Sequence, residues 1–245
     1  MITTISTSPF VATSYPHRLH PSTARSLCKT SIVGVKGAAH TASEYKESWV
    51  DALPAYYLSK KLQEVTGFNN NKYGFESLVE VSADASRALN PLMQRELVLQ
   101  ALHNAIPHVI PFMVRNLLPQ SRFSRECFAV FTRMFFVWLI GECEIMESEV
   151  NGRKEKNVVR IKKCRLLDNT NCVGICTNMC KIPTQKYMKE SMAMPVNMTP
   201  NFEDMSCEMI FGEEAPTLKQ DKALNHPCFT SCKLKKKAGN FVCGI

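Results

Sequence analysis

The sequence lacks the short motifs that identify several common enzyme classes. It contains no P-loop, no G-x-G-x-x-G fingerprint, no G-x-S-x-G elbow and no internal repeat. The sequence therefore does not support a nucleotide-dependent enzyme or an α/β-hydrolase. The haem attachment motif C-x-x-C-H is also missing. Only His103, His108 and His226 follow residue 43, and they lie far apart in the sequence. A two-histidine, one-carboxylate iron site is therefore poorly supported.

Acidic residues are absent from the first 43 positions, and the first one in the chain is Glu44. The same segment holds seven Ser and seven Thr, and its basic residues are Arg18, Arg25, Lys29 and Lys36. It has no apolar core of the secretory kind. We therefore expect residues 1–43 to be a plastid transit peptide, cleaved between about residues 28 and 45. A mitochondrial presequence or a disordered cytosolic tail is the alternative.

The chain has neither a strong charge nor a long apolar run. Of the formal net charge of +8, the leader carries +4, which leaves about +4. Basic and aromatic residues are not interleaved, so nucleic acid is not an expected partner. Arg133 and Glu142 bracket the most apolar run, which is too short to cross a membrane. The basic tail, residues 233–245, is expected to be flexible, although it could contact an anionic plastid membrane peripherally.

Residues 44–146 are expected to form a helical region. Apolar residues at helical spacing run from 53 to 65 and stop at Gly67, and a second stripe ends at Asn90-Pro91. A third runs from residue 93 to 118, where Pro107 and Pro111 should kink or split it. A fourth carries an aromatic stripe of Phe128, Phe131, Phe135 and Trp138.

This fourth helix has two interpretations. A helix that is apolar all round is usually buried. Alternatively, Phe131, Phe135 and Trp138 line a groove for a long apolar ligand, or the helix dips into a bilayer surface.

Cysteine is abundant: seven of the eleven cysteines lie between residues 164 and 232. Cys172, Cys176 and Cys180 are spaced i, i+4 and i+8, which places three thiols on one helix face. Cβ atoms at that spacing are ~5–6 Å apart, whereas a disulfide needs Cβ atoms ~3.8 Å apart. Cys228 and Cys232 repeat the spacing. This pattern favours metal binding over disulfides with distant partners or buried structural thiols.

The number and softness of the thiols favour iron, as a 4Fe–4S cluster, although zinc stays open. We expect Cys172, Cys176 and Cys180 to be ligands, with a fourth thiolate from Cys207, Cys228 or Cys232. Cys164 could join the last two at a second iron site.

Residues 147–232 are expected to form a cysteine-rich α+β unit. Asn151-Gly152 is a hairpin signal, residues 158–161 and 205–211 have strand patterns, and the cysteine helix should end near Lys181, where Pro183 follows. The predicted fold class is α+β, with an N-terminal helical bundle packed on this small unit.

Several sequence strings resemble the plastid β-carotene isomerase family of strigolactone biosynthesis. They are EVNGRKEK (149–156), KCRLL (163–167), NCVGIC (171–176), CKIPTQ (180–185), MSC (205–207) and PCF (227–229). The resemblance is dense from residue 147 to 232 and thinner over the preceding helices. It omits the leader and the tail, so Cys243 is not expected to be functional.

The resemblance implies an iron-dependent plastid enzyme that interconverts all-trans-β-carotene and 9-cis-β-carotene at the 9,10 double bond. Its product would feed carotenoid cleavage dioxygenases on the route to carlactone. No catalytic residues can be carried over. Two other functions fit the residues alone: a plastid iron–sulfur electron carrier and a non-catalytic carotenoid-binding module.

Overall fold

Three helices form the first part of the structure and end where the sequence predicts. The computed structural model describes residues 48–150, 152–228 and 232 of the chain. The helices are α1 (Trp49–Thr66), α2 (Gly74–Ala88) and α3 (Pro91–Ala105). A capping box of Ser48 and Asp51 starts α1, and Gly67 ends it in the left-handed conformation. Asn90 caps α3, with Pro91 in its first turn.

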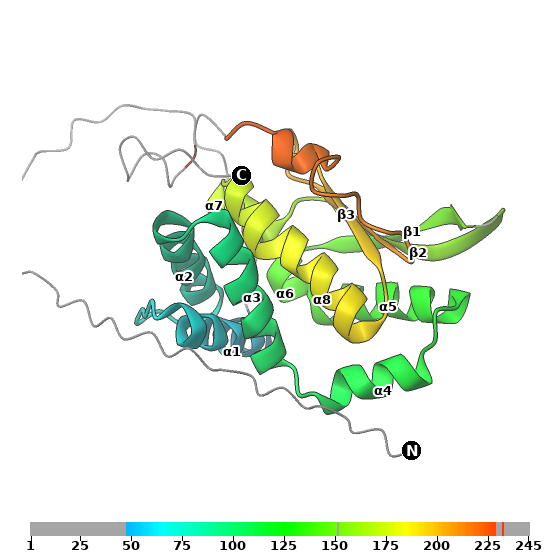
Figure 1. Cartoon of the computed structure of the whole chain (residues 1–245), viewed down its shortest axis with the longest axis horizontal. Coiled ribbons are helices and arrows are strands. Elements are labelled where there is room, and N and C mark those ends of the chain that lie inside the picture. Colours follow the sequence, from blue (N-terminus) through cyan, green and yellow to red (C-terminus); the bar gives the residue numbers. More distant parts are fainter. Residues whose placement is uncertain (1–47, 151, 229–231, 233–245) are drawn as a thin grey trace, which may run out of the picture. The chain divides into compact units, whose positions relative to one another are not determined.

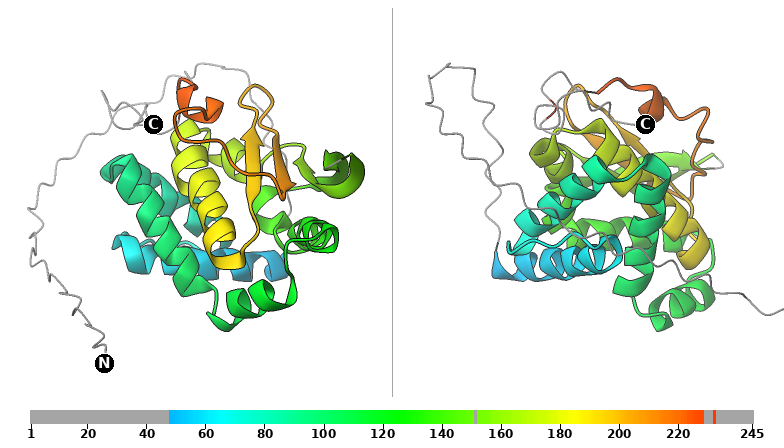
Figure 2. Two further views of the ribbon diagram at one scale, coloured as in Figure 1. Left: turned by 45° about the vertical axis from the view of Figure 1, so that its right-hand side comes forward. Right: turned by 60° about the vertical axis from the view of Figure 1, so that its left-hand side comes forward.

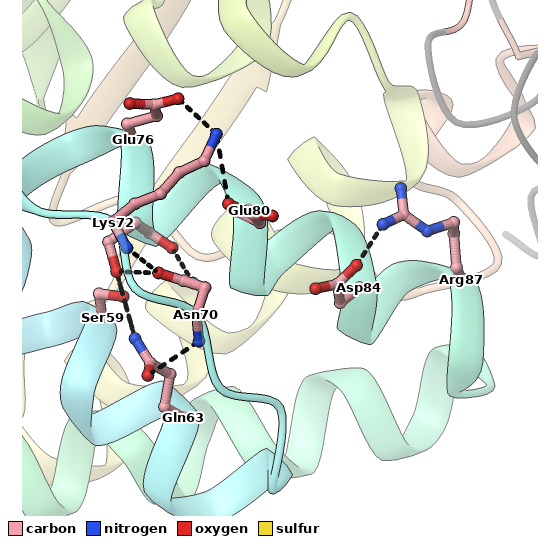
Figure 3. Close-up of polar contacts among 9 residues, drawn as sticks. Ser59, Gln63, Asn70, Lys72, Glu76, Glu80, Asp84 and Arg87 are labelled. Carbon is pink, nitrogen blue, oxygen red and sulfur yellow. Dashed lines mark hydrogen bonds and ion pairs between the residues drawn. The ribbon is translucent and has the colours of Figure 1, made fainter. Parts of the chain in front are cut away.

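A buried polar network joins α1 to α2 (Figure 3). The hydroxyl groups of Ser59 and Ser77 are hydrogen-bonded at 2.8 Å, and the Gln63 amide donates to Ser59 at 3.0 Å. From the connecting loop, the Asn70 amide donates to the Ser77 carbonyl. Because these polar groups are satisfied inside the bundle, the two helices are held in one register.

The next helices lie in the lower half of the ribbon, with the last of them near its centre (Figure 1). They are α4 (Val109–Leu117), α5 (Arg122–Phe135) and the short α6 (Val137–Ile140). The third predicted stripe breaks at Pro107, whereas Pro111 sits in the first turn of α4, where its missing N–H costs nothing. In the described part of the chain, no single helix is long and apolar enough to cross a membrane. The pair α3 and α4 passes that test only together, across an 86° bend.

The fourth predicted helix is broken at Phe136, and the expectation that it is buried on all sides is wrong. One side of α5 packs on the sheet through Ser124, Ala129 and Thr132, which are buried. Its outer side is exposed at Phe131 and Phe135. The helix is therefore amphipathic in its packing, although nearly every residue near its end is apolar.

A four-stranded antiparallel sheet follows, in the order β1-β2-β4-β3. Its strands are β1 (Cys143–Val150), β2 (Arg153–Ile161), β3 (Val196–Pro200) and β4 (Cys207–Phe211). Val150 pairs with Arg153 across the predicted hairpin, and Gly152 adopts a positive φ of 74°. The sheet confirms the α+β class. Strand β1 crosses residue 147, so the expected boundary between the helical and cysteine-rich regions falls inside a strand.

The spacing of the cysteines predicted one regular α-helix. The segment that carries them is instead divided into several elements. Helix α7 (Arg165–Thr170) ends at Asn171 in the left-handed conformation, directly before Cys172. A π-helix, η1 (Ile175–Lys181), follows and runs without interruption into α8 (Ile182–Met192). Pro183 therefore does not end the helix: it lies in the first turn of α8, a position that tolerates proline. A 3₁₀ turn, η2 (Lys222–Asn225), comes after the sheet.

Helix α8 lies between α3 and β3, and α5 packs against β2 (Figure 1). The other views show α1 and α4 at the end opposite to η2 (Figure 2). The described residues all belong to one compact unit and share one hydrophobic core, which extends from α1 to Cys232. The helical bundle and the cysteine-rich region are thus packed together.

Candidate functional site

Strand pairing brings Cys164 and Cys207 to the same edge of the sheet. Cys207 opens β4 opposite Ile161, the last residue of β2, and Cys164 follows Ile161 by three residues. The Cys164 N–H donates to the Met205 carbonyl at 2.7 Å. Cys207 points inward with Met209 and Phe211, which confirms the predicted alternation of β4.

Cys176 and Cys180 are supplied by the π-helix η1. A π-helix closes i→i+5 hydrogen bonds, is rare, and often marks a functional site. Its last such bond runs from the Ile182 N–H to the Thr177 carbonyl. The altered winding moves Cys180 relative to the α-helical position that its spacing predicts.

Burial and mutual repulsion raise the pKa values of these thiols. Burial is the main cause at Cys176, Cys180 and Cys207, and it raises the pKa of Cys180 to about 12. Neighbouring thiols add to the shift: Cys180, Cys164 and Cys207 all raise the pKa of Cys176. Cys164, Cys176, Cys180 and Cys207 therefore lie close enough to act on one another. We call them the four-thiol group.

A buried ion pair lies beside the four-thiol group. The Lys181 ammonium contacts the Asp221 carboxylate at 2.5 Å, and both side chains are almost fully buried. Its positive charge lowers the pKa values of Cys176 and Cys207 against the effect of burial. The pair also ties η1 to η2, since Asp221 accepts from the Ala223 N–H.

The other predicted ligands are Cys172, Cys228 and Cys232, which lie in or against the same hydrophobic core. Cys172 is fully buried, one turn before Cys176, whose N–H donates to its carbonyl at 3.2 Å. Cys232 is fully buried and Cys228 is half-buried against the core. The helical turn predicted to join Cys228 to Cys232 lies outside the described residues, as does Cys243. Their roles stay predictions.

The four-thiol group matches iron–sulfur chemistry in the kind of donor it offers. Within residues 48–150, 152–228 and 232, no three His, Cys, Asp or Glu side chains lie close enough to hold one metal ion. In a 4Fe–4S cluster, each thiolate binds a different iron, so the ligands surround an object larger than one ion. A bound cation would also reverse the repulsion that raises these pKa values.

An aromatic path runs from the surface to the core along the end of α5 and into α6. The rings of Phe135 and Phe131 stack at 4.4 Å, and Phe136 links Phe131 at 6.0 Å to Trp138 at 6.3 Å. Phe135 is 57% exposed, whereas Trp138 is 8% exposed. The predicted one-sided stripe is therefore wrong for Trp138, because the break at Phe136 turns it inward.

Arg165 links the inner end of this path to the four-thiol group. Its guanidinium donates to the Trp138 carbonyl and lies 3.8 Å from the centre of the Phe75 ring. It directly follows Cys164 in the chain. Neither Arg165 nor Phe136 was predicted from the sequence, although each directly follows a predicted site residue.

A cavity of about 220 Å³ lies elsewhere, against α8 and β3. Its lining includes the charged side chains of Lys186, Lys189, Glu190 and Glu214. Such a lining does not suit a hydrocarbon ligand.

Comparisons with known proteins agree in one family. A family profile described as "Beta-carotene isomerase D27-like, C-terminal" matches residues 138–220. The chain is 54% identical over 192 residues to "Beta-carotene isomerase D27, chloroplastic" of Medicago truncatula, covering 78% of this chain and 76% of that protein. It is 44% identical over 196 residues to the protein of the same name from Arabidopsis thaliana, covering 79% and 74%. Both names confirm the predicted plastid location. No solved structure matches the chain.

Proposed function

The chain belongs to the D27-like β-carotene isomerase family, and we propose that it interconverts all-trans-β-carotene and 9-cis-β-carotene. The isomerised bond would be the 9,10 double bond, and the product would enter the route to carlactone and strigolactones. We choose this reaction because the chain is similar, over most of their length, to relatives that are named for it. The choice of site is supported by the group of four thiols and by the bond that joins Arg165, the residue after Cys164, to Trp138 at the end of the aromatic path.

The reaction requires a transient loss of double-bond order. Rotation about an amide, which has only partial double-bond character, already has a barrier of ~18–20 kcal/mol. A turnover of about 1 s⁻¹ allows a barrier of about 17 kcal/mol. A polyene carbon–carbon double bond resists rotation more than an amide, so the protein must do more than bind and orient the substrate.

We propose that Cys164, Cys176, Cys180 and Cys207 hold iron, with Cys172, Cys228 and Cys232 as further candidates. An iron–sulfur cluster supplies reversible one-electron exchange, which could lower the bond order of a polyene with no net redox change. Three of the four thiols, Cys164, Cys176 and Cys207, are buried, and Cys180 is half-buried, so the proposed centre would be largely shielded from water. The Lys181 cation favours the thiolate form that a metal needs.

Phe135, Phe131 and Phe136 form the proposed contact surface for the polyene. Their rings offer apolar surface along which a linear hydrocarbon would lie, from the exposed Phe135 toward Trp138. Arg165 holds the Trp138 backbone and so ties the inner end of the path to the segment that carries Cys164.

Incubating the full chain anaerobically with pure all-trans-β-carotene, followed by chromatography of the isomers, tests the proposal. We expect the 9-cis isomer to accumulate to an equilibrium ratio that is also reached from pure 9-cis-β-carotene. A carotenoid-binding module would retain carotene with an unchanged ratio. An electron carrier would neither retain nor convert it, and either of these results would refute isomerisation.

A further inference from the structure

Helices α4 and α5 expose an unusual amount of apolar surface. On α4 the exposed apolar side chains are Val109, Ile110, Phe112, Met113 and Leu117, and on α5 they are Phe123, Val130, Phe131, Met134 and Phe135. We call these ten residues the apolar face. Those on α5 are spaced i, i+7, i+8, i+11 and i+12, which places them on one side of the helix. Groups of exposed apolar side chains that form a large patch mark interaction sites.

The exposed apolar side chains of α4 do not pack this helix on the protein, although Val114 packs half-buried against the core. None of its residues is buried. Instead, polar groups hold this part of the chain to the end of α8: Arg115 donates to the Glu190 carbonyl at 3.0 Å, and Gln120 donates to the Ala193 carbonyl at 3.0 Å. The helix is thus anchored by its polar residues while Phe112 and Leu117, each 68% exposed, face outward.

Positive charge accompanies the apolar face. Residues 106–140 contain four arginines and one glutamate, which gives this segment a formal charge of +3. Arg125 forms a bidentate pair with Glu155, and Arg122 pairs with Glu126. Arg115 and Arg133 are exposed. Exposed aromatic and aliphatic residues with flanking arginines are the composition of a helix that lies in the interface of an anionic membrane.

We propose that the apolar face docks on the surface of an anionic lipid bilayer and that carotene enters the protein from there. The entry of carotene from the bilayer rests on the proposed function. Phe131 and Phe135 belong both to the apolar face and to the outer end of the aromatic path. The surface that inserts into lipid is therefore continuous with the aromatic path toward Trp138. A C40 hydrocarbon resides in the apolar phase, so this arrangement spares it a passage through water.

Sedimentation with lipid vesicles tests the docking without carotene. The full chain is mixed with vesicles of neutral lipid alone or with anionic lipid added, at low and high salt. We expect binding that increases with anionic lipid and weakens at high salt. The double variant Phe112→Ser/Met134→Ser should lower the partition coefficient about tenfold or more, because two side chains that are 68% and 69% exposed lose their insertion. Both positions are too exposed for the change to impair folding.

The matched control is Leu92→Ser/Leu218→Ser, which removes two side chains that are 63% and 53% exposed outside the apolar face. It should bind vesicles as the wild type does. Every variant retains residues 1–43, so a contribution of the leader to binding cancels. Equal binding by the wild type and the Phe112→Ser/Met134→Ser variant would overturn the docking proposal. So would a dimer, seen by light scattering, that the same variant dissolves, since a second copy would then cover the face.

Activity assays separate this inference from the proposed function. With carotene embedded in vesicles, the Phe112→Ser/Met134→Ser variant should isomerise it at least several-fold more slowly than the wild type. With carotene in detergent micelles, the two should be equally active. Equal rates on vesicles would refute entry from the bilayer while leaving isomerisation intact. Vesicle binding with no isomerisation in either medium would refute the proposed function and leave the docking intact.

Discussion

At the scale of single residues, exposure separates the two ends of the aromatic path. Phe135 is 57% exposed and stacks on Phe131, whereas Trp138 lies in the hydrophobic core. The sequence identified both as apolar and as neighbours on a helical stripe. It could not show that the helix breaks at Phe136, because Phe-Phe-Val carries no cap residue, glycine or proline.

Alanine substitutions at these two positions should therefore differ in their effect on stability. Phe135→Ala should cost less than about 1 kcal/mol of unfolding free energy and should raise the apparent KM for β-carotene. Trp138→Ala should cost about 3–5 kcal/mol, as a large buried side chain does. Urea unfolding and isomerisation kinetics measure the two quantities. A severe loss of stability with an unchanged KM in Phe135→Ala would mean that this residue only supports the fold.

At the scale of elements, the sequence identified helices by their ends and missed what tertiary contacts impose. Gly67 and Asn90-Pro91 marked helix boundaries correctly, because capping is encoded locally. Strand β3 went unpredicted: it has five residues and ends at a proline, which an edge strand tolerates. The π-helix η1 was also missed, since its sequence has no local signature and its geometry depends on the core around it.

The link between η1 and η2 should be essential for stability. Replacing Lys181 with Met leaves the Asp221 carboxylate buried without its cation, which should cost about 3–5 kcal/mol. The matched control is Lys189→Met. Its pair with Glu214 is exposed, so the loss should be about 0–1 kcal/mol. Equal unfolding midpoints for the two variants in urea would show that the buried pair does not hold the elements together.

At the scale of the whole molecule, the four-thiol group makes folding of the metal-free protein depend on pH. Burial keeps these thiols protonated in the folded state and raises the pKa of Cys180 to about 12, whereas thiols of the unfolded chain titrate near pH 8.5. Above about pH 8.5 the unfolded state therefore binds fewer protons than the folded state, and stability must fall as pH rises. Below that pH the contribution is fully present.

Urea midpoints of the metal-free protein should accordingly decrease from pH 7.5 to pH 10. The double variant Cys176→Ser/Cys207→Ser should show a shallower decrease, because two of the raised pKa values are removed. Parallel pH profiles for the two proteins would show that these thiols are not held protonated by the fold.

The proposed role of the four-thiol group is to hold the iron that isomerises β-carotene. Measuring iron, acid-labile sulfide and isomerase activity in the same anaerobic preparations of the wild type, Cys176→Ser and Cys127→Ser tests this role. Cys127 is half-buried on α5, outside the four-thiol group, and serves as the control. We predict that Cys176→Ser loses iron, sulfide and activity together, while Cys127→Ser keeps all three. Full activity in Cys176→Ser, or wild-type iron without labile sulfide, would contradict the account.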